Sequence, residues 1–203
     1  MDIRSAVQRI VTVVIIATGG ATTCFASPGN IYSSEFDLPI PAETDSSIGW
    51  MDDALLEVPD HIIISDVDVG ISVTHTNVFD LQIFLQSPSG TRICLNMYDS
   101  FEGFFAGENY TNTIFDDEAQ SSISQAEPPF TGRFRPLDLY TLSEFDNEDA
   151  FGFWRLQIYD AFYYNSGTLD RVELMITTPE PTAAMLLVLG AGLLRLFCAR
   201  QDG

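Results

Sequence analysis

The sequence predicts an all-β protein, an antiparallel β-sandwich of the jelly-roll kind. Two observations lead to this fold class. Apolar and polar residues alternate over four segments, which is the period of a half-buried strand, and clusters of Gly, Pro, Asn and Ser separate the segments. Strands divided by such turns, with almost no helical pattern, favour a sandwich. At 203 residues the chain accommodates one domain of this kind with a segment at each end.

The alternating segments cover residues 67–73, 81–85, 154–158 and 172–176. The first two meet at a break at Asn77, and a Ser-Pro-Ser-Gly turn at residues 87–90 closes the second. An Asn-Ser-Gly turn at residues 165–167 precedes the last segment. The apolar residues that we expect to face the core are Val67, Val69, Ile71 and Val73, then Leu81, Ile83 and Leu85, then Trp154, Leu156 and Ile158, and finally Val172, Leu174 and Ile176.

The amino-terminal segment has the layout of a secretory signal peptide. Two arginines, Arg4 and Arg9, precede an apolar run at residues 10–17, and small residues follow as far as Ala26. This order predicts a signal peptide over residues 1–26 with cleavage after Ala26. Residues 27–37 contain Gly and Ser and predict a flexible lead into the domain.

The carboxy-terminal segment, residues 179–203, begins with the motif Pro179, Glu180 and Pro181. A hydrophobic helix is expected at about residues 183–199, at the lower length limit for a membrane span. The order of motif, apolar run and basic residues resembles the PEP-CTERM sorting signal of exopolysaccharide-producing Gram-negative bacteria. The resemblance implies an exported protein of the cell envelope or extracellular matrix, anchored in the membrane before an exosortase processes it. The ending, residues 200–203, departs from that signal because it lacks a cluster of arginines.

The charge of the chain limits its partners. It has 29 acidic residues against 9 arginines and no lysine, for a formal net charge of −20. Such a surface repels nucleic acid and anionic lipid, so a nucleic-acid partner is not expected. The acidic excess has two readings, solubility or the binding of a hard cation such as Ca²⁺. Cys94 is the one cysteine between the end segments, so we expect no disulfide in the domain.

Residues 38–178 resemble the P domain (P/Homo B domain) of subtilisin-like proprotein convertases. The resemblance rests on the block at residues 74–91, on Phe-Asp-Asp-Glu-Ala at 115–119, on residues 130–137, and on residues 152–160 followed by Gly-Thr-Leu at 167–169. It implies a jelly-roll module that normally follows a protease catalytic domain, for which this chain has no room. His61 and His75 are the two histidines, and no Gly-x-Ser-x-Gly elbow occurs. We therefore expect no enzyme.

Calcium is the one cofactor that the sequence suggests. Hard cations take several carboxylate and carbonyl oxygens from turns, and the candidate ligands are Asp99, Asp116, Asp117, Glu118 and Asp160. Asp66 and Asp68 lie on one face of a strand and repel each other unless a cation or an arginine lies between them. The alternative is that all these acids are solvated turn residues.

The aromatic residues suggest a ligand. Two loops are rich in them, one with Phe101, Phe104 and Phe105 and the other with Phe162, Tyr163 and Tyr164. Exposed rings beside carboxylates can stack on sugars; alternatively, these rings close the ends of the sandwich. The first functional hypothesis is a structural or adhesive module that binds extracellular polysaccharide or a partner protein. The second is an accessory domain that supports a subtilisin-like serine endopeptidase in trans.

Overall fold

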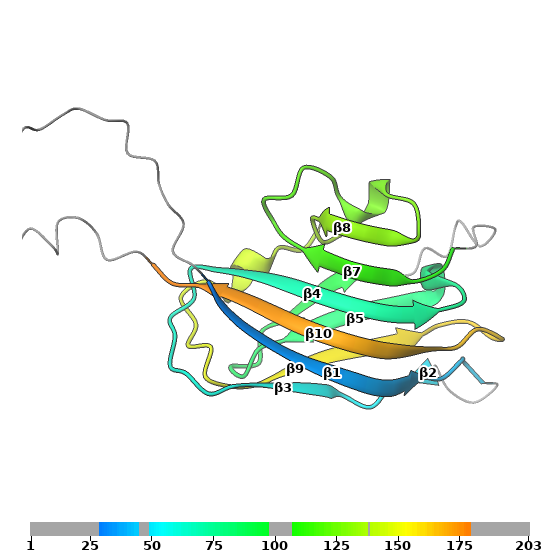
Figure 1. Cartoon of the computed structure of the whole chain (residues 1–203), viewed down its shortest axis with the longest axis horizontal. Coiled ribbons are helices and arrows are strands. Elements are labelled where there is room, and N and C mark those ends of the chain that lie inside the picture. Colours follow the sequence, from blue (N-terminus) through cyan, green and yellow to red (C-terminus); the bar gives the residue numbers. More distant parts are fainter. Residues whose placement is uncertain (1–28, 45–48, 98–106, 138, 180–203) are drawn as a thin grey trace, which may run out of the picture.

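The computed structural model describes residues 29–44, 49–97, 107–137 and 139–179. It confirms an all-β fold in which two sheets form a sandwich (Figure 1). The first sheet, here the β4 sheet, has the order β1 (Asn30–Ile40), β10 (Gly167–Thr177), β4 (Asp66–His75), β7 (Tyr110–Phe115) and β8 (Phe130–Phe134). The second, the β9 sheet, has the order β2 (Gly49–Trp50), β9 (Gly152–Asp160), β5 (Leu81–Gln86) and β6 (Arg92–Asn96), with β3 (Ala54–Val58) also paired to β9. Short 3-10 helices are η1 (Val78–Asp80), η2 (Ile123–Gln125) and η3 (Leu142–Phe145).

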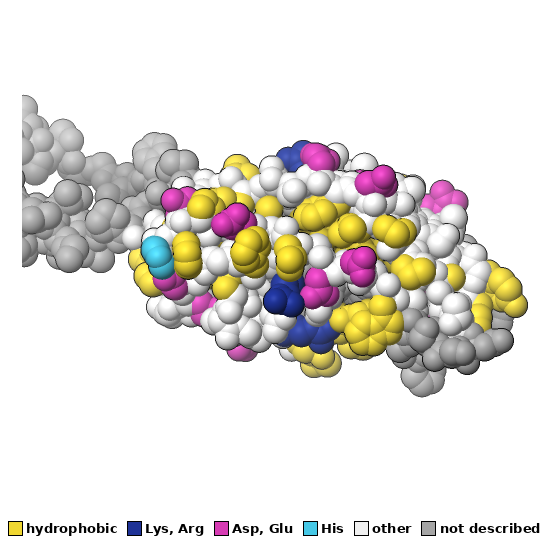
Figure 2. All heavy atoms as spheres, turned by 90° about the horizontal axis from the view of Figure 1, so that it is seen from below, with side chains coloured by type: hydrophobic (Ala, Val, Ile, Leu, Met, Phe, Trp, Pro, Cys, Tyr) yellow, Lys and Arg dark blue, Asp and Glu magenta, His cyan; other side chains and the backbone are white. Residues whose placement is uncertain are grey.

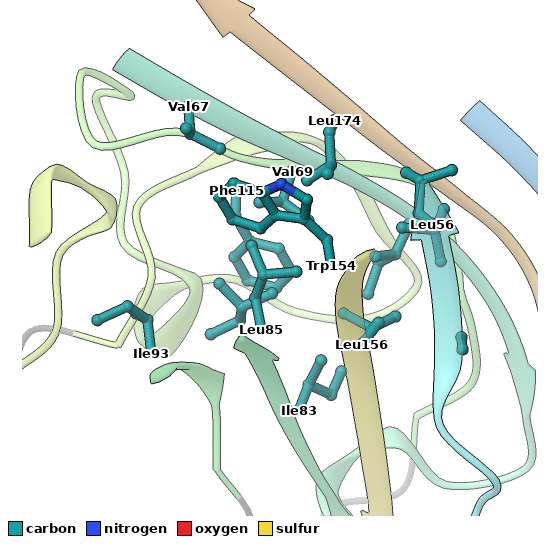
Figure 3. Close-up of a cluster of buried hydrophobic side chains, with 14 of the residues drawn as sticks. Leu56, Val67, Val69, Ile83, Leu85, Ile93, Phe115, Trp154, Leu156 and Leu174 are labelled. Carbon is teal, nitrogen blue, oxygen red and sulfur yellow. The ribbon is translucent and has the colours of Figure 1, made fainter. Parts of the chain in front are cut away.

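The core lies between the two sheets, and the predicted apolar residues fill it. All the residues expected to face inward from the four alternating segments are buried. Trp154 lies among Val69, Phe115 and Leu85 in Figure 3. Its Nε1–H donates to the carbonyl oxygen of Ala150 at 3.0 Å, so this large side chain is buried without an unpaired donor.

A β-bulge keeps β10 in phase with the core. Leu169 and Val172 are three positions apart, yet both are buried, which a regular strand with a period of two does not allow. The register with β4 shifts between Leu169 and Arg171, and this extra residue restores the inward orientation. The predicted alternation at residues 172–176, which follows the bulge, is confirmed.

The hairpin of β5 and β6 forms at the predicted Ser-Pro-Ser-Gly turn. The amide of Gly90 donates to the carbonyl oxygen of Ser87 at 3.0 Å, and Gly90 has a φ of 104°. A residue with a side chain rarely adopts this conformation, so glycine suits this position of the turn. The predicted break at Asn77 also holds, because β4 ends at His75 and η1 precedes β5.

Two features of the fold differ from the expectation. β7 and β8 are parallel, whereas the other strand pairs are antiparallel, because the chain between Phe115 and Phe130 returns to the end of the sheet from which β7 started. The second is the expected flexible lead at residues 27–37. Its described part from Asn30 belongs to β1, which pairs with β10, and Tyr32, Phe36 and Leu38 pack against the core. Ser33 and Ser34 lie between Tyr32 and Phe36, so the sequence did not show the clear apolar–polar alternation that predicts a strand.

The expected signal peptide, the signal cleavage at Ala26, the Glu180–Pro181 part of the sorting motif and the helix at about 183–199 lie outside the described residues. Within the described ranges, no helix has the length and apolar character needed to cross a membrane.

Candidate functional site

Three carboxylates converge where β4 begins. Oxygen atoms of Asp66, Asp68 and Glu118 lie within 4.8 Å of one another. β7 runs antiparallel to β4, with Phe115 opposite Val69, so the loop that follows β7 lies beside the first residues of β4. We refer to these three residues as the acidic cluster. It joins two of the predicted features, the Asp66–Asp68 pair and one member of the loop acids.

An arginine neutralises part of this region. The Nη1 of Arg133, on β8, lies 2.7 Å from an oxygen of Asp68 and 2.6 Å from an oxygen of Asp116. β8 brings it there because Arg133 is opposite Ile114 on the parallel neighbour β7. The sequence allowed a cation or an arginine between Asp66 and Asp68, whereas Arg133 pairs with Asp68 and Asp116. Within the described ranges, Asp66 and Glu118 have no ion pair with an arginine.

The ionised form of each carboxyl group in the acidic cluster is destabilised, and the pKa of each is raised. Burial, and then the neighbouring Asp68 and Asp116, raise the pKa of Asp66 above its ordinary value. Burial raises the pKa of Asp68 although Arg133 donates to it. Burial and the charge of Asp66 raise the pKa of Glu118. A cation would relieve this repulsion, and carboxylate oxygens are the ligands that Ca²⁺ prefers.

Among the described residues, the other predicted calcium ligands, Asp116, Asp117 and Asp160, are not members of the cluster. Both oxygens of Asp117 accept backbone N–H groups at the start of η3, from Leu142 at 3.0 Å and from Ser143 at 2.9 Å. Asp160 lies at the far end of the sandwich, beside the last residue of β4, about 30 Å away at roughly 3.3 Å per strand residue. Asp99 lies outside the described residues. Of the five candidates, Glu118 is therefore in the cluster and Asp116 is next to it.

Asp160 takes part in a buried polar network instead. Its Oδ2 lies 3.1 Å from Nε2 of His75, and both side chains are fully buried. The Oδ1 of Asp160 accepts the N–H of Phe162 at 2.9 Å. The adjacent Asp80 accepts from the amide groups of Asn77 and Asn165 at 2.8 and 2.6 Å. These bonds tie the ends of β4 and β9 to the start of β5, which indicates a structural role.

The two histidines lack the surroundings of a catalytic base. Nδ1 of His75 lies 2.8 Å from the backbone oxygen of Asn77, and no hydroxyl or thiol in the described ranges hydrogen-bonds to the ring. His61 is at the surface, where it pairs with Asp149 at 2.7 Å and stacks on Phe151. Neither arrangement holds a nucleophile against a base. Cys94 is buried, and burial raises the pKa of its thiol to about 11.

The outer face of the β9 sheet exposes large apolar side chains, a feature that the sequence reasoning missed. Trp50 is 61% exposed, and Leu55 and Phe153 are also exposed. Leu55 and Phe153 alternate with buried residues along β3 and β9, and this alternation was the available signal. The side of the molecule where β1, β2 and β3 lie carries hydrophobic side chains interspersed with acidic ones, and basic side chains adjoin a large hydrophobic group there (Figure 2).

The loop after β9 adds two tyrosines. Tyr164 is 99% exposed and Tyr163 is also exposed, with their ring centroids 6.0 Å apart. The structure therefore does not use these two rings to close the end of the sandwich. Phe101, Phe104 and Phe105 lie outside the described residues.

The strand order and the enclosed core define a two-sheet β-sandwich. The family model of the proprotein convertase P-domain matches residues 64–176. The match covers more than half of the chain, so the chain belongs to this family.

Two solved structures are similar to part of the chain. One is the crystal structure of a serine protease of Aeromonas sobria, with 18% identity, a TM-score of 0.40, and coverage of 74% of this chain and 27% of that chain. The other is a complex of the A. sobria serine protease with a chaperone, with 16% identity, a TM-score of 0.41 and the same coverages. The chain thus spans about a quarter of the length of those proteins. No curated protein matches it.

Proposed function

We propose that this protein is an exported, non-catalytic P-domain module that binds an extracellular polysaccharide or a partner protein at the cell envelope. The observation that carries this proposal is the outer face of the β9 sheet, where Trp50, Leu55 and Phe153 are exposed. Large apolar side chains gathered on one face are typical of an interaction surface. The absence of a nucleophile beside His75 in the described ranges supports a binding role rather than catalysis.

The proposed location rests on the end segments. The signal peptide at residues 1–26 would export the chain, and the motif Pro179, Glu180 and Pro181 would direct an exosortase to it. Replacing these three residues with alanine should leave the protein in the membrane fraction, while the unchanged protein reaches the cell surface or the matrix. Equal distribution of the two proteins would contradict the sorting role.

A second candidate function is support of a subtilisin-like serine endopeptidase in trans. Membership of the P-domain family favours it, because the module accompanies such enzymes. If this function holds, adding the chain to a subtilisin-like protease encoded beside its gene should raise the melting temperature of that protease. Unchanged melting and unchanged activity of the protease would exclude this function.

We also propose that calcium stabilises the domain through the acidic cluster. The support is the mutual distance of Asp66, Asp68 and Glu118 and the raised pKa of each carboxyl group. Three carboxylates fit the hard-oxygen preference of Ca²⁺, with the remaining positions left to water.

Binding of the full chain to a glycan array, and to candidate proteases immobilised on beads, tests the main proposal. Phe153→Asp should weaken whichever interaction is found, since it replaces an exposed apolar ring of this face with a charge. Ile31→Asp, on the β4 sheet, is the matched control because Ile31 is also exposed. If the control weakens binding as much as Phe153→Asp does, the outer face of the β9 sheet is not the site.

A further inference from the structure

One end of the outer face of the β9 sheet is a layer of aromatic and planar groups. Trp50 contacts Tyr159 with ring centroids 4.5 Å apart and an interplanar angle of 71°. From the other side, the guanidinium of Arg92 lies 5.9 Å from the Tyr159 ring and 3.7 Å from the Phe84 ring. Tyr159 is buried between Trp50 and Arg92, whereas these two remain exposed. We refer to Trp50, Phe84, Arg92 and Tyr159 as the aromatic platform.

Polar groups beside the platform are fixed in place. The side-chain oxygen of Gln157 accepts from Nε of Arg92 at 2.8 Å, and its amide group donates to Asp53 at 3.0 Å. Asp53 also accepts from Arg155 at 3.3 Å. The side chains of Arg92, Gln157 and Asp53 have more hydrogen-bond donors and acceptors than these contacts use. The remaining donors and acceptors can bond to the hydroxyl groups of a ligand.

The platform and the polar groups form a row along β9. Outward-facing positions from Tyr159 to Phe153 span about 20 Å at roughly 3.3 Å per residue. Exposed rings, those of Trp50 and Phe153, lie toward the two ends of the row, and the polar groups lie between them. A protein interface has the reverse arrangement, because charged residues are depleted from its centre. A sugar chain matches the row, since each ring has an apolar face and a rim of hydroxyl groups.

The charge of the protein and of this face favours a neutral polysaccharide over an anionic one. The chain carries −20 overall, so a polyanionic ligand is repelled. The face itself is balanced, with the acids Asp53 and Glu57 and the bases Arg92 and Arg155. Within the described ranges, Arg92 has no carboxylate partner. Its Nε and Nη2 donate to Gln157 and Tyr159, and its remaining N–H groups can donate to hydroxyl oxygens. An uncharged ligand rich in hydroxyl groups complements this surface.

We propose that the outer face of the β9 sheet binds a neutral polysaccharide. A sugar ring stacks on Trp50, and the sugar hydroxyl groups accept hydrogen bonds from Arg92, donate to Asp53, and do either with Gln157. This inference rests on the proposed binding function and specifies its ligand and its site. Since the contacts are surface side chains on a preformed sheet, binding needs no change in the fold.

Native gels that contain a polysaccharide test the proposal with the full chain. The probes are hydroxyethylcellulose, glucomannan, galactomannan and dextran, with alginate as the anionic comparison. We expect at least one neutral polymer to retard the protein. Trp50→Ala should weaken the apparent affinity about tenfold, the loss expected for one stacked ring, and Arg92→Ala should weaken it also. Ile31→Ala is the control, because Ile31 is 62% exposed against 61% for Trp50 and lies on the other sheet.

Melting curves of the variants show whether they are folded, and Trp50→Phe, which keeps a ring, should retain most of the binding. If no neutral polymer retards the protein, or if Trp50→Ala, Arg92→Ala and Ile31→Ala behave alike, the proposal is wrong. A partner protein or alginate that binds through Phe153 would then preserve the proposed function and overturn only the neutral-sugar ligand. If no ligand depends on this face, both proposals fail.

Discussion

Replacing Arg133 with glutamine tests the electrostatic account of the region around the acidic cluster. In the folded protein its Nη1 contacts Asp68 at 2.7 Å and Asp116 at 2.6 Å. A hydrogen bond between charged groups contributes about 1.5–3 kcal/mol when it is shielded from water. The carboxylates are 14% and 9% exposed, but the guanidinium is 47% exposed, so solvent screening removes roughly half of the sum. We expect a loss of about 2 kcal/mol, which corresponds to a fall of about 4–8 °C in melting temperature.

The assay is thermal unfolding followed by circular dichroism at pH 7 in the presence of a calcium chelator. The matched control is Arg155→Gln, because Arg155 is 51% exposed and its contact with Asp53 is longer, at 3.3 Å. Such a surface pair contributes about 0–1 kcal/mol. The difference between Arg133→Gln and the unchanged protein should also shrink at about pH 3, because burial raises the pKa of Asp68 and this carboxyl group is protonated there.

Two results would refute this reasoning. One is an equal loss of stability in Arg133→Gln and Arg155→Gln, which would mean that the burial of the carboxylates does not strengthen the pair. The other is a loss in Arg133→Gln that is the same at pH 7 and pH 3, which would mean that the arginine contributes through packing rather than through charge.

Three further predictions concern the cluster and the core. Asp66→Asn should raise the urea midpoint at pH 7 and not at pH 3.5. The raised pKa of Asp66 means that the folded state binds the proton more tightly than the unfolded state does. The ionised carboxylate therefore destabilises the fold at neutral pH, and this destabilisation disappears as the pH falls through the raised pKa. A lower midpoint at pH 7 would contradict this sign. Adding 10 mM CaCl2 should stabilise the protein by about 1.4 kcal/mol if the dissociation constant is about 1 mM, as in weak extracellular sites. Glu118→Gln should reduce this gain in stability. A melting temperature that calcium leaves unchanged would exclude the calcium site. Trp154→Phe should cost about 2–4 kcal/mol in urea unfolding, because it leaves a cavity and the oxygen of Ala150 without its donor; a loss below 1 kcal/mol would show that the core repacks.

The sequence predicted the fold where the information is local. Alternation over residues 67–73 and 154–158 specified both the strands and their inward faces, because successive side chains of a strand point to opposite sides. The Ser-Pro-Ser-Gly turn was predictable because Gly90 can adopt a positive φ. β1 was missed because Ser33 and Ser34 lie between its apolar residues, and its strand form depends on pairing with β10, more than 100 positions away.

The candidate site was predictable in composition but not in grouping. The loop acids were recognised by residue type, yet Asp160 belongs to a buried network with His75, 85 positions away in the chain. Asp66 and Glu118 meet because β7 lies antiparallel beside β4, and the position of Arg133 depends on the parallel β8. The platform at Trp50 combines side chains from β2, β5, β6 and β9, and no local pattern relates these four strands.

By itself, the sequence determined that this protein is an acidic β-sandwich with the motifs of a P domain, because strand period, turn chemistry and charge are properties of neighbouring residues or of the whole composition. Only the tertiary structure decided which acids share a cluster, which are neutralised by Arg133, and which face exposes Trp50. These outcomes depend on strand register, and a shift of one residue exchanges the two faces of a strand. Register is set by contacts between distant segments and by bulges such as the one at Leu169 in β10, so it follows from the packed core rather than from any one stretch of the chain.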